Sequence, residues 1–85
     1  SGGRVVNSIL SRGVRVHSYA EIDDSIVFPD VEIGENAKIK RAIIDRGVKI
    51  APGEKIGYNL DEDKKKYFVS ESGIVVVSLP ERKTL

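Results

Sequence analysis

The feature that most limits how this chain can fold is a 17-residue repeat. When the sequence is laid out on that period, aliphatic residues fall into five columns of three. Neither the 3.6-residue period of a helix nor the continuous two-residue period of a long strand produces this spacing. The chain is therefore expected to turn at short, regular intervals. The columns are Ile9/Ile26/Ile43, Leu10/Val27/Ile44, Val14/Val31/Val48, Val16/Ile33/Ile50 and Ile22/Ile39/Ile56.

Within each repeat, the strongest aliphatic positions are six, six and five residues apart. In a hexapeptide-type β-solenoid, each six-residue unit forms a short strand and a corner, and one aliphatic side chain per unit points to the axis. Three such units with one shortened corner make one coil of the observed period. The sequence therefore predicts an all-β, single-stranded parallel β-helix of about three and a half coils over residues 5–57. Its inward side chains would be Leu10, Val16, Ile22, Val27, Ile33, Ile39, Ile44, Ile50 and Ile56.

Three further columns have a physical role on this interpretation. Small or β-branched residues lie four positions after most inward side chains, and Glu54 in the last coil departs from that rule. A column of Gly13, Asp30 and Gly47 suits a corner with positive φ. A column of Arg15, Glu32 and Lys49 alternates in sign, so stacked coils would not place like charges side by side.

The repeat ends at Gly57, and the flanking segments are expected to differ from it. Residues 1–4 are interpreted as a junction or linker, and residues 58–85 as a helix, strand and tail that cap the solenoid. Asn59–Tyr67 predicts a short helix, because Asn59 is a good N-cap and the acids precede the lysines. Tyr67–Ser78 predicts one or two strands with a turn at Ser72-Gly73.

Composition excludes several classes of function. With no cysteine, the chain has no thiol nucleophile and no thiolate zinc site, and its single histidine excludes a three-histidine metal centre. A formal net charge of +1 offers no electrostatic footprint for nucleic acid or for an anionic membrane. Its apolar runs are too short for a transmembrane span. We therefore expect no metal, nucleic-acid or membrane partner.

Two groups of residues are candidates for a site. Arg46 lies just before a corner, and Lys40 and Arg41 precede it by a few residues, so the three cations are expected near one edge of a coil. They either bind an anion, which arginine suits through its planar fork of donors, or form a solvated corner that pairs with Asp45 or Asp24. His17 is either an exposed structural residue or the general base of an acyltransferase.

Three segments together resemble the C-terminal domain of bacterial glucose-1-phosphate adenylyltransferase (ADP-glucose pyrophosphorylase). They are Ala42–Arg46 (Ala-Ile-Ile-Asp-Arg), Ala51–Gly57 (Ala-Pro-Gly-Glu-Lys-Ile-Gly) and Tyr67–Val77 (Tyr-Phe-Val-Ser-Glu-Ser-Gly-Ile-Val-Val-Val). The resemblance implies that the β-helix is left-handed and carries no catalytic residue. The reaction, from ATP and glucose 1-phosphate to ADP-glucose and pyrophosphate with Mg, would belong to an N-terminal nucleotidyltransferase domain.

The resemblance also implies a role in regulation and oligomerisation. The anionic effector would be a sugar phosphate, a keto acid or AMP, and the parent protein would be a cytoplasmic homotetramer. Arg46 matches an arginine of the family's regulatory anion site, which Lys40, Arg41 and either Arg82 or Lys83 would complete. Two alternatives stay open: an acyltransferase fragment that uses His17, and a non-catalytic or differently specific sugar nucleotidyltransferase homologue.

Overall fold

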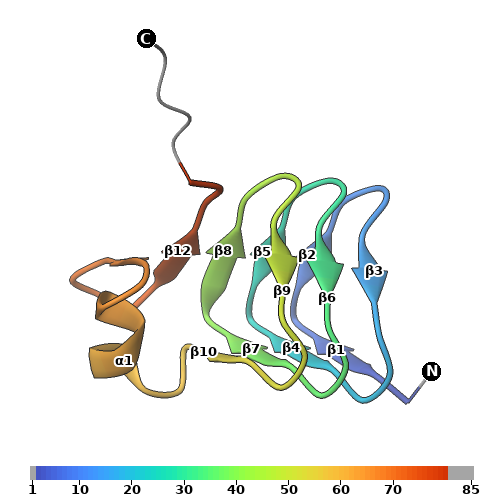
Figure 1. The fold of residues 1–85 in the computed structure, drawn as a ribbon, viewed down its shortest axis with the longest axis horizontal. Helices are drawn as coiled ribbons and strands as arrows, with labels where there is room; N and C mark the ends of the chain where they lie inside the picture. Colours follow the sequence, from blue (N-terminus) through green and yellow to red (C-terminus); the bar gives the residue numbers. More distant parts are fainter. Residues whose placement is uncertain (1, 81–85) are drawn as a thin grey trace, which may run out of the picture.

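The computed structural model describes residues 2–80, which form three short sheets around one axis (Figure 1). The first sheet contains, in order, β1 (Arg4–Val6), β4 (Glu21–Asp23), β7 (Lys38–Lys40) and β10 (Lys55–Ile56). The second contains β2 (Ile9–Leu10), β5 (Ile26–Val27), β8 (Ala42–Ile44), β12 (Val75–Val77) and β11 (Phe68–Val69). The third contains β3 (Arg15–Val16), β6 (Glu32–Ile33) and β9 (Lys49–Ile50).

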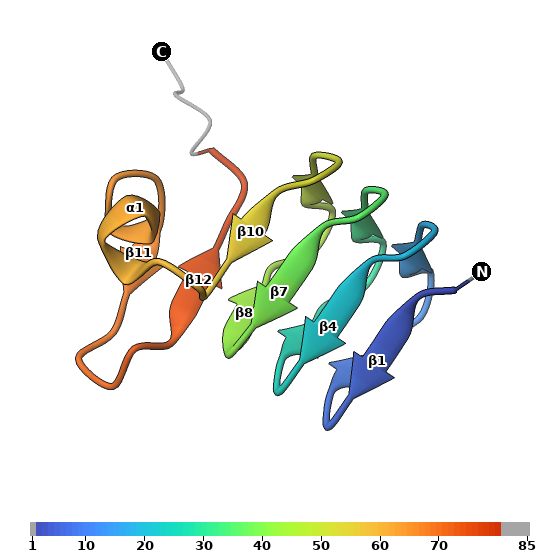
Figure 2. The same cartoon turned by 90° about the horizontal axis from the view of Figure 1, so that it is seen from below.

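The register of these sheets confirms the 17-residue coil. Strand β1 pairs in parallel with β4, so that Val5 lies beside Ile22, and β4 pairs with β7, so that Ile22 lies beside Ile39. Strands β3 and β6 of the third sheet have the same offset. Figures 1 and 2 together show the chain advancing along the axis as a left-handed coil, which confirms the predicted β-helix.

The predicted inward side chains form the core. Seven of the nine are buried, from Ile22 to Ile56, and the small side chains of Ala20 and Ala37 are fully buried between them. The two exceptions lie in the first coil, where Leu10 is 37% exposed and Val16 is half-buried. Residues 2–80 include no coil beyond β1 to cover them.

Each coil turns at three corners, and each corner uses the left-handed region of backbone space. Gly13, Asp30 and Gly47 have φ values of 72°, 63° and 74°, as their shared column predicts. Two further columns with the same backbone conformation were not predicted from the sequence. They are Asn7/Asp24/Arg41, with φ of 47°, 49° and 50°, and Tyr19/Asn36/Gly53, with φ of 63°, 62° and 75°.

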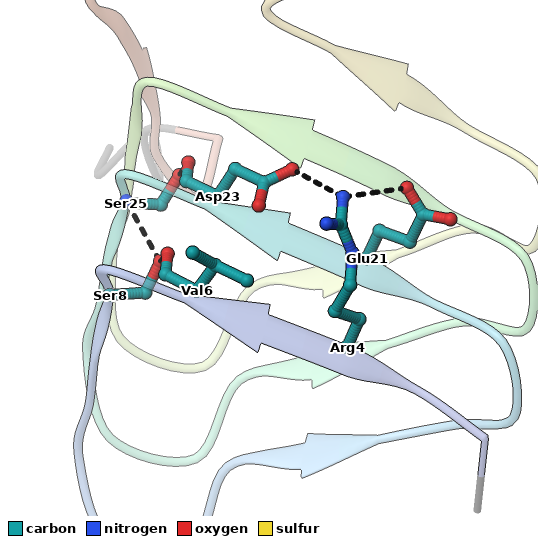
Figure 3. A network of polar contacts seen from close by, with 6 residues as sticks. All are labelled: Arg4, Val6, Ser8, Glu21, Asp23 and Ser25. Carbon is teal, nitrogen blue, oxygen red and sulfur yellow. Dashed lines mark hydrogen bonds and ion pairs between the residues drawn. The ribbon is translucent and has the colours of Figure 1, made fainter.

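A ladder of serines satisfies backbone groups at one of these corners (Figure 3). The Ser25 amide donates to the Ser8 hydroxyl at 3.1 Å, and the Ala42 amide donates to the Ser25 hydroxyl at 3.2 Å. Both hydroxyls donate in turn to a carbonyl two residues earlier in their own coil. Because Ser25 is buried, these bonds replace contacts with water that its polar groups lose.

The predicted helix is present but shorter than expected. α1 spans Leu60–Lys64, and the Asn59 side chain accepts a hydrogen bond from the Glu62 amide at 3.2 Å, which confirms the N-cap. Asp63, only 2% exposed, accepts a hydrogen bond from the Gly57 amide at 2.9 Å. This bond attaches α1 to the end of the last regular coil, and Tyr67 lies beyond the helix.

The C-terminal segment predicted as one or two strands forms two, a hairpin that returns to the solenoid. β11 and β12 pair antiparallel, with Gly73 at φ 86° in the turn between them. Strand β12 then pairs in parallel with β8, placing Val76 beside Ile43 at nearly twice the regular offset. One repeat has therefore gained an insertion, which forms α1 and β11, before the chain resumes its place in the sheet. Strand β12 covers the end of the core on this side, as a cap is expected to do (Figure 2).

Candidate anion-binding site

Arg46 lies in the corner that follows β8, next to Gly47. Its amide donates to the Asp45 carboxylate at 2.7 Å, and its Nε lies 3.7 Å from Oδ2 of Asp30 in the preceding coil. The sequence suggested Asp45 or Asp24 as partners of its side chain, whereas the ion pair is with Asp30. Both charged side chains are more than half exposed, so the pair is weak and leaves the guanidinium accessible to a ligand.

Arg41 lies at the opposite end of β8 and holds the cap in place. Its backbone adopts φ 50°, its guanidinium donates to the Ser72 carbonyl at 2.9 Å, and its carbonyl accepts from the Val75 amide at 3.2 Å. A hollow of about 260 Å³ lies beside it, lined by Asp24, Ile26, Arg41, Ala42, Ile43 and Ile74. The contacts of Arg41 are thus with the hairpin and not with Arg46.

Lys40 is engaged with an aromatic ring. Its Nζ lies 4.6 Å from the centroid of the Tyr58 ring, a cation–π contact just beyond the end of β10. Burial raises the pKa of the Tyr58 hydroxyl, and the nearby carboxylates of Asp23 and Glu21 raise it further. Lys40 therefore helps to attach the segment after the last coil.

The five cations proposed from the sequence thus have different surroundings. Arg46 is presented on the surface at one end of β8, while Arg41 and Lys40 contact the capping segment. Arg82 and Lys83 lie outside the described residues. Arg46 retains the chemistry expected of it, because its planar fork can donate two parallel hydrogen bonds to a phosphate or carboxylate.

His17 belongs to a charged cluster on the third sheet. Its Nε2 lies 2.7 Å from Oε2 of Glu32, whose other carboxylate oxygen accepts from Arg15 at 3.1 Å. The hydrogen bond with His17, and then the charge of Arg15, hold the pKa of Glu32 below its usual value. The sequence analysis missed Glu32 as the partner of His17. The 17-residue register could have predicted this partner, because it places Glu32 beside Arg15, which is two residues from His17.

A hollow of about 490 Å³ adjoins this cluster and includes Gly34 and Pro52. A Cβ on Gly34 would lie 2.6 Å from the Pro52 nitrogen, so only glycine fits between these coils.

Residues 2–80 contain no group of three His, Cys, Asp or Glu side chains placed to hold a metal ion. In the same part of the chain, no helix has the length and apolar character needed to cross a membrane.

The comparisons with known proteins agree with one another and with the fold. Residues 1–77 match the model of the family described as GlmU-like, C-terminal hexapeptide. The chain is 50% identical to a glucose-1-phosphate adenylyltransferase of Koribacter versatilis over 92% of its own length, and 50% identical to one of Deinococcus deserti over 91%. It is 52% identical to glucose-1-phosphate adenylyltransferase 2 of Vibrio cholerae over 91%.

In each of these three alignments the chain covers 19% of the relative, so it spans about a fifth of the length of the enzymes it resembles. The match to the family model extends from the first coil through the capping strand β12. The parallel coils, their 17-residue register and this match lead to one conclusion: the chain belongs to the GlmU-like, C-terminal hexapeptide family.

Proposed function

We propose that this chain is the regulatory and subunit-contact domain of a glucose-1-phosphate adenylyltransferase. The observation that carries the proposal is the identity of about one half with such enzymes over nine-tenths of the chain. The reaction of ATP with glucose 1-phosphate, with Mg bound to the nucleotide, would take place in a separate N-terminal domain. The 85-residue chain would contribute no catalytic residue.

In this proposal Arg46 binds an anionic effector together with residues of the N-terminal domain. An effector changes activity only to the extent that it binds one arrangement of the two domains more tightly than the other. A guanidinium at a solenoid corner suits this role, because the coils are rigid while the exposed fork can reach a ligand at a domain boundary. Sugar phosphates, keto acids and AMP all carry the phosphate or carboxylate that arginine recognises.

The experiment is the substitution Arg46→Ala in the longer protein that contains this chain. Pyrophosphate release from ATP and glucose 1-phosphate is measured with and without fructose 1,6-bisphosphate, pyruvate and AMP. We expect the effector concentration for half-maximal response to rise about 10- to 100-fold, since a charge-assisted hydrogen bond contributes about 1.5–3 kcal/mol. Basal turnover should stay nearly unchanged.

The matched control is Arg12→Ala, which removes an exposed arginine from the same column of the repeat, two coils away. It should leave the response intact. An unchanged response in Arg46→Ala would remove this residue from the effector site. Absence of pyrophosphate release under every condition would refute the adenylyltransferase assignment and favour an acyltransferase or an inactive homologue.

A further inference from the structure

The hollow beside His17 exists because one column of the repeat changes from a large side chain to none. His17, Gly34 and Ala51 occupy equivalent positions in three consecutive coils. The imidazole therefore has no side chain beside it in the next coil, and a space of about 490 Å³ is left. Because a Cβ on Gly34 would meet the backbone at Pro52, this position admits only glycine, and no side chain from it can fill the space. The hollow is thus built into the coils.

The lining of the hollow combines an apolar surface with a few polar side chains. Gly34 and Ile50 are buried at its base, and Ala51 and Pro52 add further apolar surface. The polar side chains are those of His17, Glu32, Glu35 and Lys49. Small-molecule sites typically measure about 300–1,000 Å³ and have mostly apolar walls, with a small number of polar groups that orient the ligand. The hollow has the size and the composition of such a site.

Glu32 fixes the protonation and the orientation of His17. Nε2 of His17 lies 2.7 Å from Oε2 of Glu32, and Arg15 donates to the other carboxylate oxygen at 3.1 Å. These contacts lower the pKa of Glu32, so its carboxylate is ionised at neutral pH and can only accept hydrogen bonds. Nε2 must therefore carry the proton, which leaves Nδ1 of an uncharged imidazole as an acceptor. The polar side of the hollow is ordered before a ligand arrives, which lowers the cost of binding.

The charges around the hollow balance one another. Glu32 and Glu35 are negative, whereas Lys49 and the Arg15 side chain that pairs with Glu32 are positive. An anion or a cation is attracted by one pair and repelled by the other, so neither is favoured. An uncharged ligand with hydroxyl groups meets both requirements, because a hydroxyl can donate to the carboxylate of Glu32 or Glu35 and accept from the Lys49 ammonium. The site therefore selects a neutral ligand that both donates and accepts.

We propose that this hollow binds a neutral saccharide, with one pyranose ring against the apolar lining and its hydroxyl groups directed to Glu32, Glu35 and Lys49. A pyranose ring suits the hollow because it has C–H groups on its faces and, around its rim, hydroxyls that both donate and accept. The site goes beyond the proposed function and does not depend on it. It is also separate from Arg46, which precedes β9, whereas the hollow lies at the corner that follows β9.

The first test is an NMR titration of the isotope-labelled 85-residue chain with methyl α-D-glucopyranoside and with maltotriose. The chain has a single histidine, so its imidazole resonances report on the hollow alone, and dispersed amide signals verify the fold. We expect saturable shifts of the His17 imidazole and of the Gly34 and Ala51 amides. For a ligand with so few atoms, the dissociation constant should be about 1 mM. No saturable shift at concentrations about 100-fold above this constant would overturn the proposal.

The second test is the substitution Glu32→Gln, which keeps the shape of the side chain and removes its charge. We expect the affinity for the glucoside to fall at least about 10-fold, because hydrogen bonds to charged groups are the strong ones. The matched control is Glu21→Gln on β4, which also removes an outward carboxylate paired with an arginine, Arg4, but lies on the first sheet. Equal affinities in the parent chain and in Glu32→Gln would overturn the proposal.

A second variant leaves the contact between Glu32 and His17 in place. Lys49→Gln removes the ammonium donor from an exposed position of β9, so the fold is not expected to change. We expect the affinity to fall about 5-fold or more, while the control Lys55→Gln, at an exposed position of β10 on the first sheet, leaves it unchanged. Equal losses in the two lysine variants would contradict a site in the hollow.

Charged ligands test the class of ligand. Inorganic phosphate and pyruvate are titrated at constant ionic strength, and the His17 imidazole signals are followed as before. We expect either anion to bind more weakly than the glucoside, since Glu32 and Glu35 repel it. An anion that shifts the His17 signals at a lower concentration than the glucoside would overturn the proposal and make the hollow an anion site.

The longer protein that contains this chain provides the last test. Saturation-transfer NMR with maltotriose should give a signal that decreases in its Glu32→Gln variant and not in its Glu21→Gln variant. A signal that Glu32→Gln leaves unchanged, or no signal, would overturn the proposal, because the hollow would then be unused or covered. None of these measurements depends on activity or on Arg46, so an unregulated or inactive protein that still binds the saccharide would refute the proposed function alone.

Discussion

The two ends of the solenoid differ in how well the core is covered from solvent. At the N-terminal end, β1, β2 and β3 are the edge strands of their sheets, and Leu10 is 37% exposed. At the other end, Ile44 of the same column is fully buried, because β12 lies beside β8. Within β12, Val75 is fully buried and Val77 is 3% exposed.

The difference shows that a coil of this fold buries only what its neighbours cover. The inward side chains of each coil are covered on both sides only when another coil or a capping segment lies next to that coil. The cap at the C-terminal end requires a change in the chain, since the insertion of α1 and β11 precedes the return of β12 to the sheet. Gly57 and Asp63 make the junction between the repeating and the capping regions.

The largest expected effect comes from breaking that junction with Gly57→Ala. Gly57 has φ 91°, and an added Cβ would collide with the Lys40 carbonyl, which is backbone and has little freedom to move. We expect the free energy of unfolding to fall by more than about 3 kcal/mol, as overpacking and backbone strain combine. Chemical denaturation monitored by circular dichroism measures the loss.

Gly53→Ala is the matched comparison within the regular coil. Gly53 also has positive φ, at 75°, but no atom lies within 4 Å of the added Cβ. Only the backbone preference is lost, so destabilisation should be about 1 kcal/mol. Equal losses for the two glycines would contradict the assignment of a special role to the junction.

The next prediction concerns truncation of the core at its two ends. Ile44→Ala removes a fully buried side chain beneath the cap and should destabilise the protein by about 2–5 kcal/mol. Leu10→Ala in the same column should have less than half that effect, because its side chain already contacts water. Thermal and urea unfolding of both variants compare them directly. A Leu10→Ala loss as large as that of Ile44→Ala would mean that the N-terminal end is covered in solution.

The smallest effect concerns the charged third sheet, away from both ends. His17 and Arg15 lower the pKa of Glu32 in the folded chain, so their stabilisation is present above the ordinary glutamate pKa and is lost as the pH falls through the lowered value. In His17→Ala, the pKa of Glu32 should rise towards its ordinary value, and this part of the acid sensitivity should disappear. NMR titration of the Glu32 carboxyl follows the change, and Arg4→Ala on the first sheet serves as control. An unchanged Glu32 pKa in His17→Ala would rule out His17 as its cause.

Most of the fold could be predicted from the sequence, because a solenoid converts spacing directly into structure. A residue and the residue 17 positions later become neighbours, so aliphatic columns predict both the register and the inward side chains. The same argument predicted the positive φ of Gly13, Asp30 and Gly47. It missed the columns Asn7/Asp24/Arg41 and Tyr19/Asn36/Gly53, because each contains a residue, Arg41 or Tyr19, with no preference for positive φ, which hides the signal of the other two members.

The candidate site was less predictable. Lys40, Arg41 and Arg46 are close in sequence, but Arg41 and Arg46 lie at opposite ends of β8. Their partners come from other coils or from the cap, as Asp30 does for Arg46 and Ser72 for Arg41. Glu54 shows the same limit, since the Tyr67 hydroxyl that hydrogen-bonds to it lies 13 positions later, outside the repeat.

The sequence by itself therefore determined the coil, its length and its core, because all three follow from the 17-residue repeat of aliphatic residues. The tertiary structure decided where the period is interrupted and how the chain returns to β8. It also decided which side chains of the coils meet the capping segment, as Arg41 meets Ser72 and Glu54 meets Tyr67. These features depend on contacts between segments whose separation follows no repeat, so spacing alone carries no information about them.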